Sequence, residues 1–248
     1  SPDWWIVNGP NGGTLAAMIM RALTETVGDA ERRPRSLTIH FTAAPREGPI
    51  RIAPQVERAG RSLTTVTARV EQGERLVGLA IAAFSRSREG AVEFAHAQMP
   101  DVPSPDDIEE FPHSAEFPRF MDNWDFRRAF GEPLWSGASE ALVGGWVRPA
   151  DRQEWDYPLI TQLSDVWFPA VFPMLDGPNP VPTVDLTVHF RAELPLAALQ
   201  RDDFALVRFR TQVSAHGFIE EDGGIWAPDG TLIAQSRQLA LLQALSQE

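Results

Sequence analysis

A five-residue strand pattern occurs twice in this chain, and this repeat constrains the fold more than any other feature. Residues Leu37–Phe41 read Leu-Thr-Ile-His-Phe, and residues Leu186–Phe190 read Leu-Thr-Val-His-Phe. In both copies apolar residues alternate with polar ones, which is typical of a strand with one buried face. The chain is therefore expected to contain two related halves.

The surroundings of the two copies match as well. An apolar run with helical spacing precedes each strand, over residues 13–22 and 165–175. A hairpin with a tight turn follows each strand, over residues 63–84 and 218–242. Each half thus reads as a helix followed by antiparallel strands, and Pro169 and Pro173 predict that the second helix is short or kinked. Repeated units of this kind bury their open faces and edges against one another, so we expect one joined assembly.

An acidic, proline-rich segment separates the two halves. Residues 88–119 mix prolines with aspartates and glutamates, a composition typical of linkers. We therefore predict an N-terminal unit over residues 1–87, a linker over residues 88–119 and a C-terminal unit over residues 120–248.

Charge and composition exclude several classes of function. The chain of 248 residues has a formal net charge of −12 and no basic tract that could neutralise nucleic-acid phosphates. It contains no cysteine, which excludes thiolate catalysis and favours a cytoplasmic location, and no lysine, which excludes Schiff-base chemistry. No apolar run approaches the roughly 20 residues of a membrane helix, so we expect no membrane partner. The first residues show no targeting pattern, and their abrupt start leaves room for a strand before residue 1.

Comparison of the two halves singles out three polar residues of the second half. Asp165, Thr183 and Gln238 stand where the first half has side chains that cannot take up a proton. A carboxylate, a hydroxyl and an amide can together position and activate a water molecule. Structural interpretations exist for each residue: a helix cap, an ordinary strand position and a partner of a buried backbone group. The first-half counterparts, in the same order, are Gly13, Pro34 and Ile81.

The turn before the first helix offers a second kind of site. Gly12, Gly13 and Thr14 open the helical run, and backbone N–H groups at a helix start can bind an anion or a carbonyl oxygen. The alternative is a tight turn whose glycines allow close packing. His40 and His189 occupy equivalent positions of the repeat, which indicates a structural role, and no spacing of His, Asp and Glu resembles a metal site.

Several motifs, taken in order, resemble the double-hotdog acyl-CoA thioesterases, the thioesterase II family. The first half is similar in its Asn-Gly-Gly helix start, its Pro-x-Ser before the repeated strand and residues 57–62 before a long hairpin. The second half is similar over residues 164–168, 183–190 and 229–238. The chain departs from the family at residues 216–222, where the family often has Arg-Gly.

The resemblance implies an α+β fold of two fused hotdog units, each a long helix wrapped by an antiparallel sheet, with the sheets side by side. It also implies hydrolysis of acyl-CoA thioesters by a water that Asp165 deprotonates and that Thr183 and Gln238 hold. No cofactor or metal is expected in this reaction.

The resemblance also carries expectations about the substrate. The backbone N–H groups of residues 12–14 are expected to polarise the carbonyl oxygen, and arginines at the rim to meet the CoA phosphates. The chains are expected to form homo-oligomers of double hotdogs. Two other interpretations stay open: a hotdog hydratase or dehydratase with an Asp/His pair, and a non-catalytic acyl-CoA or lipid-binding protein. The candidate arginines are Arg58, Arg61 and Arg237.

Overall fold

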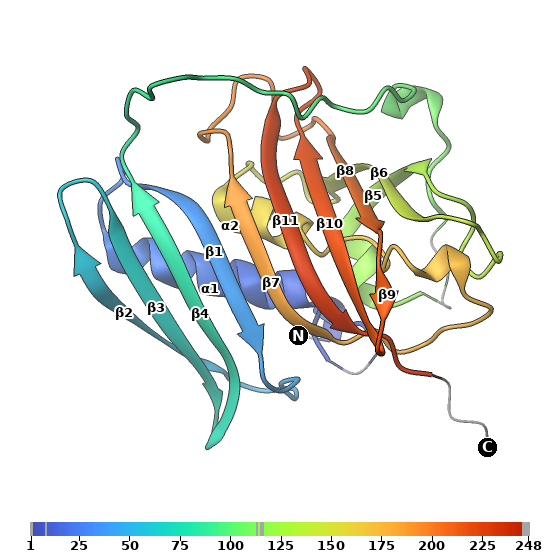
Figure 1. Cartoon of the computed structure of the whole chain (residues 1–248), viewed down its shortest axis with the longest axis horizontal. Helices are drawn as coiled ribbons and strands as arrows, with labels where there is room; N and C mark the ends of the chain where they lie inside the picture. The colour runs from blue at the N-terminus through green and yellow to red at the C-terminus, as the bar shows by residue number, and fades with distance from the viewer. Residues whose placement is uncertain (1, 8, 113, 115–116, 245–248) are drawn as a thin grey trace.

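The computed structural model describes residues 2–7, 9–112, 114 and 117–244. Eleven strands of this part of the chain form one antiparallel sheet, and a long helix lies behind one half of it (Figure 1). The strands are β1 (Arg33–Phe41), β2 (Arg51–Ala59), β3 (Thr64–Gln72), β4 (Arg75–Ser85), β5 (Trp124–Phe130), β6 (Ala141–Pro149), β7 (Thr183–Phe190), β8 (Ala205–Thr211), β9 (Ser214–Ala215), β10 (Phe218–Trp226) and β11 (Leu232–Leu241). The helices are α1 (Gly12–Val27) and α2 (Tyr157–Leu163), with short 3-10 turns η1 (Pro2–Trp4), η2 (Pro105–Asp107), η3 (Arg119–Asn123) and η4 (Phe172–Met174).

The two repeated strands join the halves. The strand order is β2-β3-β4-β1-β7-β11-β10-β8-β6-β5, so β1 and β7 are neighbours at the centre of the sheet. Their equivalent residues Thr38 and Thr187 face each other across the junction, with the two hydroxyl oxygens 3.0 Å apart. A local pseudo-two-fold axis that relates the two halves therefore passes between these threonines. The expectation of two units joined edge to edge in one sheet is confirmed.

The long helix α1 has clear sequence signals at both ends. The Asn11 side chain caps its start by accepting a hydrogen bond from the Thr14 N–H at 3.0 Å. Gly28 ends it in the left-handed conformation at a φ of 62°, where glycine carries no steric cost. Between these caps, Ile19, Met20 and Leu23 are fully buried and belong to the main hydrophobic core. Burial of this apolar face fixes α1 against the sheet.

The second helix lies earlier in the chain than the sequence predicts, and it is short. The sequence places a helix over residues 165–175, but α2 has seven residues and ends before Asp165. Asp156 caps its start through a 2.8 Å hydrogen bond from the Leu159 N–H. Pro169 and Pro173 explain the error, because proline removes a backbone donor and clashes inside a helix. The apolar residues there pack as an irregular segment. The second half has a short helix, as these prolines predict, but the helix starts at Tyr157 and not at Asp165. Only the first half has the long helix that the resemblance implies.

The hairpin register corrects one of the three correspondences. Gln238 on β11 pairs with Leu186, whose first-half equivalent Leu37 pairs with Ala82. The counterpart of Gln238 is therefore Ala82, which is buried, and not Ile81, which is 49% exposed. A shift of one residue in a strand exchanges the two faces of the sheet.

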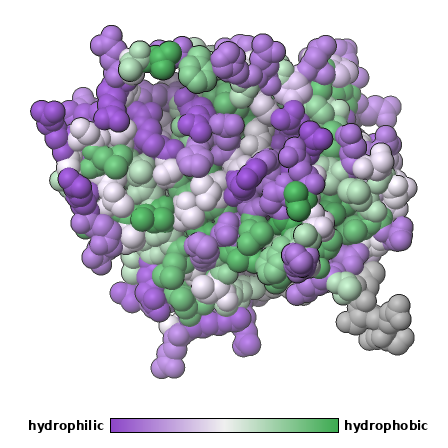
Figure 2. Space-filling view, in the orientation of Figure 1, coloured by the Kyte–Doolittle hydropathy of each residue, from purple (hydrophilic) through white to green (hydrophobic). Residues whose placement is uncertain are grey.

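Figure 2 views the face opposite α1, where hydrophobic and hydrophilic residues are interspersed.

The acidic, proline-rich segment is held against the second half. The Phe111 N–H donates to the Phe126 carbonyl at 2.9 Å, and the Trp146 indole donates to the Pro103 carbonyl at 2.8 Å. Phe111 also contacts the Trp167 ring, at a centroid distance of 6.2 Å. These contacts bring the predicted linker next to the residues that follow Asp165. No helix in the described part of the chain is long and apolar enough to cross a membrane.

Candidate active site

Asp165 lies where the two halves of the chain meet. Its Oδ2 atom accepts a hydrogen bond from the Gly13 N–H at 3.0 Å and another from Asn11 Nδ2 at 3.1 Å. Asn11 Nδ2 also donates to the Asp165 carbonyl at 2.7 Å. The carboxylate thus sits at the positive end of the α1 macrodipole, which stabilises its negative charge. The first half provides the anchor for an acid that belongs to the second half.

The two glycines at the start of α1 make this contact possible. A Cβ atom on Gly13 would lie 2.4 Å from the Gln162 carbonyl oxygen and 3.1 Å from the Asp165 Cβ. A Cβ atom on Gly12 would lie 2.9 Å from Asp165 Oδ2. The interpretation that these glycines permit close packing is therefore supported. The partner is the end of α2, and Gln162 also donates to the Thr14 hydroxyl at 2.9 Å.

The same contacts do not support the expected oxyanion site. The Gly13 N–H is directed at Asp165, and the Gly12 N–H also stabilises that carboxylate. The Thr14 N–H donates to Asn11 Oδ1. A donor that already has an anionic partner is not free to receive a carbonyl oxygen. Gly12 and Gly13 thus serve Asp165, and the Thr14 N–H serves Asn11. The role of these N–H groups at the carbonyl stays a prediction that these contacts do not support.

The structure brings Thr183 and Gln238 to the other side of Asp165. The Thr183 hydroxyl donates to Gln238 Oε1 at 2.9 Å, and Gln238 Nε2 lies 3.5 Å from Asp165 Oδ1. Gln238 is 7% exposed, whereas Asp165 and Thr183 keep part of their surface open. The two Asp165 oxygens therefore have different surroundings. Oδ2 is held by the start of α1, and Oδ1 has one long contact, with the Gln238 amide that in turn binds the Thr183 hydroxyl.

A second buried carboxylate, which the sequence comparison missed, completes the cluster. Glu221 on β10 is 4% exposed and pairs directly with Gln238 on β11. Its Oε1 accepts from Gln238 Nε2 at 2.7 Å, and its Oε2 accepts from the Ala170 N–H at 2.5 Å. One signal was available in the sequence. Glu220, Glu221 and Asp222 are consecutive in a strand, so their side chains alternate between faces and at least one must point inward.

Burial changes the acidity of both carboxyl groups. It raises the pKa of Asp165 to about 6, against the opposing effect of the hydrogen bonds from Gly13, Gln238, Gly12 and Asn11. It raises the pKa of Glu221 to about 7, and the nearby Asp165 charge acts in the same direction. A carboxyl group whose pKa approaches neutrality is a competent general base at physiological pH. Buried acids of this kind occur preferentially at functional sites.

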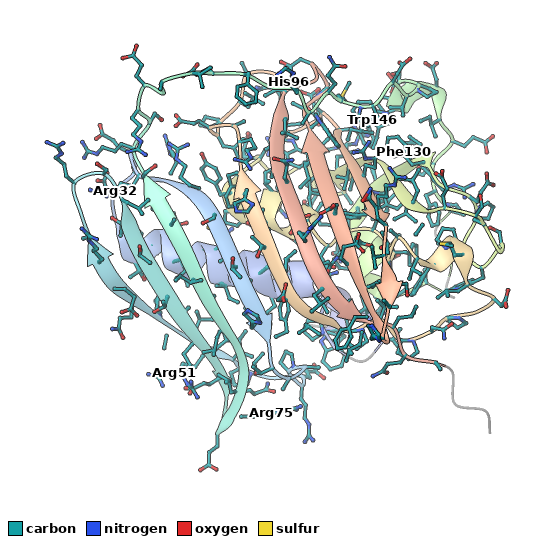
Figure 3. The ribbon with its side chains drawn as sticks, viewed as in Figure 1. Arg32, Arg51, Arg75, His96, Phe130 and Trp146 are labelled. Carbon is teal, nitrogen blue, oxygen red and sulfur yellow. The ribbon has the colours of Figure 1, made fainter. Side chains whose placement is uncertain are left out.

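The three predicted arginines lie away from this cluster. Arg237 lies on the face of β11 opposite to Gln238 and donates two hydrogen bonds of 2.6 Å to Asp222. Arg58, at the end of β2, and Arg61, in the turn that follows, are both exposed. The backbone carbonyls of this turn bind Arg32 beyond the far end of α1. Figure 3 labels Arg32 at that edge of the sheet. Because α1 has 16 residues, this turn is roughly 24 Å from Asp165 along the helix axis.

A cavity of about 490 Å³ opens beside the segment that follows Asp165. Its wall combines the predicted linker, β5, β6 and Trp167, two residues beyond Asp165. Figure 3 labels Phe130 on this side of the molecule. Volumes of this size and apolar walls are typical of small-molecule sites. The aromatic lining residues are Phe111, Phe117, Phe130, Trp135, Trp167 and Phe168.

The described residues contain no group of three or more His, Cys, Asp or Glu side chains that could hold a metal ion. His40 and His189 are exposed on the strands that join the two halves, and no hydrogen bond links either of them to Asp165 in this part of the chain. The chemistry of the cluster therefore falls to carboxylates, a hydroxyl and an amide.

Domains of a known enzyme family match most of the chain. Residues 97–242 match the acyl-CoA thioesterase C-terminal domain, and residues 1–85 match the acyl-CoA thioesterase N-terminal domain. The chain belongs to the acyl-CoA thioesterase family. Its fold is accordingly the double hotdog, with both hotdog units in one chain. Among curated proteins, no sequence matches at a significant level.

Solved structures share the fold over nearly the whole chain. A conserved hotdog protein of unknown function from Alicyclobacillus acidocaldarius is 28% identical, with a TM-score of 0.89 over 99% of this chain and 92% of that one. A putative thioesterase II from Thermobifida fusca YX is 23% identical, with a TM-score of 0.81 over 98% and 90%. The acyl-CoA thioesterase II TesB2 from Mycobacterium marinum is 20% identical, with a TM-score of 0.75 over 94% and 91%.

Proposed function

We propose that this family member hydrolyses acyl-CoA thioesters to a free acid and CoA, using a water molecule that Asp165 activates. The observation that carries the proposal is the asymmetric environment of the Asp165 carboxylate. Oδ2 is anchored by two donors from the start of α1, and Oδ1 lies 3.5 Å from the Gln238 amide nitrogen, whose partner oxygen accepts from Thr183. A pKa of about 6 leaves this group ionised at neutral pH and still basic enough to accept a proton.

The donors and acceptors around Oδ1 match those of one water molecule. The Thr183 hydroxyl already donates its one hydrogen bond to Gln238 Oε1. Its oxygen can therefore accept a hydrogen bond from one O–H of the water, while Asp165 Oδ1 accepts a hydrogen bond from the other. Gln238 Nε2 has a second N–H, which donates to the water oxygen. Three hydrogen bonds leave one lone pair of the water for the thioester carbonyl carbon.

The reaction then balances within these groups. As the water oxygen bonds to the carbonyl carbon, its proton passes to Asp165 Oδ1. The carbon–sulfur bond breaks, the CoA sulfur takes the proton from the Asp165 carboxyl group, and the carboxylic acid product leaves. Asp165 is ionised again and ready for the next water.

The aromatic cavity supports an apolar acyl group as the reacting part of the substrate. Trp167, two residues after Asp165, lines it together with five other aromatic side chains. Glu109, Glu110 and Glu132 outnumber Arg128 at the same cavity, so its net negative charge disfavours the phosphates of the nucleotide. The acyl end, rather than the CoA nucleotide, is the part of the substrate that suits this chemistry.

A non-catalytic acyl-CoA-binding protein is the main rival. Such a protein would use the same cavity. It would not need the Asp165 carboxylate, whose burial costs folding free energy and which is held in one orientation. A hotdog hydratase or dehydratase is less well supported, because no described histidine shares a hydrogen bond with Asp165.

A free-thiol assay separates these functions. Purified protein is mixed with acyl-CoAs that carry short linear, long linear, branched and aromatic acyl groups, and thiol release is followed. We expect thiol release with at least one class from the native chain, and a loss of about 10²–10⁴ in kcat for Asp165→Asn. Binding of an acyl-CoA without thiol release by the native chain contradicts the proposal and supports the binding protein.

A further inference from the structure

We propose that Glu221 is a positioning residue for this reaction, because its carboxylate holds the Gln238 amide in the one orientation that serves a water on Asp165. The inference rests on the proposed thioesterase function and extends it to a residue on a neighbouring strand. Glu221 is expected to act through Gln238 and not to touch the substrate.

The orientation of the Gln238 amide follows from its partners. The two ends of an amide differ, since the nitrogen only donates and the oxygen only accepts. Glu221 Oε1 lies 2.7 Å from one end, and an ionised carboxylate can only accept. That end must therefore be Nε2, which leaves Oε1 for the Thr183 hydroxyl at 2.9 Å. With the opposite orientation, Gln238 would offer no N–H to a water on Asp165.

The Glu221 carboxylate is itself fixed at both oxygens. Oε2 accepts the Ala170 N–H from the segment after Asp165, and Oε1 accepts Gln238 from the adjacent strand. Hydrogen bonds to an ionised carboxylate are about twice as strong as those between neutral groups, so these two bonds hold the Glu221 carboxylate in one position. The carboxylate connects β10, β11 and the irregular segment that carries Asp165.

The first half shows that the fold does not need a polar pair at this place. Gln238 corresponds to Ala82 on β4, and Ala82 pairs with Val66 on β3. The Glu221–Gln238 pair therefore corresponds to Val66–Ala82, two apolar side chains that are 0% and 2% exposed. A buried carboxylate costs more than a packed apolar residue. A structural role alone gives no reason for a charge in the second half only.

The surroundings of Glu221 make its effect depend on pH. Asp165 and Glu220 are the charged groups that act on it, and both oppose its ionisation. Asp165 lies on the segment after α2, whereas Glu220 follows the other face of β10 and binds the N–H groups of Gln212 and Val213. A protonated Glu221 would present an O–H donor, which competes for the Gln238 oxygen. The productive amide orientation therefore requires Glu221 to be ionised.

The test is the pH dependence of kcat/KM for Glu221→Gln, with Glu220→Gln as the matched control. The native activity needs Asp165 and Glu221 both ionised, so kcat/KM should fall on the acidic side with a midpoint near pH 7, the pKa of Glu221. In Glu221→Gln only Asp165 titrates, so this midpoint should lie about one unit lower, near pH 6. At high pH we expect kcat of this variant to fall about 10- to 100-fold, the loss of a hydrogen bond to a charged group. Glu220→Gln, whose carboxylate is partly exposed and screened, should leave the midpoint within about 0.3 units.

A double variant, Glu221→Val with Gln238→Ala, separates positioning from folding. It copies the apolar pair of the first half, and we expect it to fold with a native melting curve and to lose thiol release. An acidic limb that does not move in Glu221→Gln overturns the inference, whatever happens to kcat. Unfolding of the double variant also overturns it, because the pair would then serve the core. If the native chain hydrolyses no thioester, the proposed function itself is wrong. This result differs from a pH profile whose acidic midpoint stays in place in Glu221→Gln, which contradicts only the role of Glu221.

Discussion

Asp165→Asn is the sharpest test of the site, because it affects activity and stability in opposite directions. The amide keeps the shape of the carboxylate, and its oxygen can still accept the Gly13 N–H. It cannot accept a proton from water at neutral pH. We therefore expect a folded protein with kcat reduced by about 10²–10⁴.

The expected gain in stability follows from the raised pKa. Asp165 changes from an ordinary pKa of 3.8 in the unfolded chain to about 6 in the folded one, a difference of about 2 units or about 3 kcal/mol. A raised pKa means that the folded state holds the proton more tightly. Its stabilising effect is complete below about pH 4 and is lost as the pH rises through about 6. About 3 kcal/mol is an upper figure, since the residue keeps part of its surface in solvent.

Asparagine has no such titration, so the two proteins should diverge with pH. We expect the free energy of unfolding of Asp165→Asn, relative to that of the native chain, to rise by up to about 3 kcal/mol between about pH 4 and pH 7. Urea unfolding at a series of pH values measures this difference, and a free-thiol assay on the same preparations measures kcat. A stability difference that stays constant over this range would refute the buried-carboxylate reasoning, and unchanged thiol release in the folded variant would refute the site.

Three further predictions test the neighbouring parts of the cluster. Gln238→Ala should lower kcat by more than its effect on unfolding explains, and a loss of about 1–3 kcal/mol in stability with unchanged kcat would indicate a purely structural amide. Gly13→Ala should lower both kcat and stability, because its Cβ would meet the Gln162 carbonyl at 2.4 Å; a variant with native kinetics and melting would contradict this packing. Titration with a non-hydrolysable acyl-CoA analogue should give one site per chain, whereas two equivalent sites would mean that the first half also binds substrate.

The joining of the halves was predictable from the sequence, and the position of the second helix was not. Identical strand patterns indicate equivalent edges, and Thr38 and Thr187 do face each other at the junction. Residues 165–175 have the apolar content of a helix, but Pro169 and Pro173 break it. The helix forms earlier, where Asp156 supplies a cap and Pro158 lies in the first turn. These prolines predicted a short or kinked helix, but periodicity placed its start at Asp165 instead of Tyr157.

The grouping of the three candidate residues was predicted from the sequence, their connections to other residues were missed, and their catalytic role stays a prediction. Asp165, Thr183 and Gln238 do come together, although Gln238 was matched to Ile81 instead of Ala82. The hairpins differ in the length of their turns and in their bulges, so counting from the turn shifted the register by one residue. Glu221 depends on that same register, which is why a sequence comparison did not find it.

The duplication explains why the proposed site lies at the junction and why we expect one site per chain. A helix start can hold a carboxylate only if another segment brings one to it, and α1 of the first half receives Asp165 from the second half. The second half, with its short α2, leaves an irregular segment long enough to carry Asp165 there and the Ala170 N–H to Glu221. The first half keeps a long helix and fills the corresponding strand positions with Val66 and Ala82. One half thus provides a rigid anchor and the other a set of polar groups, so neither half contains a complete site alone.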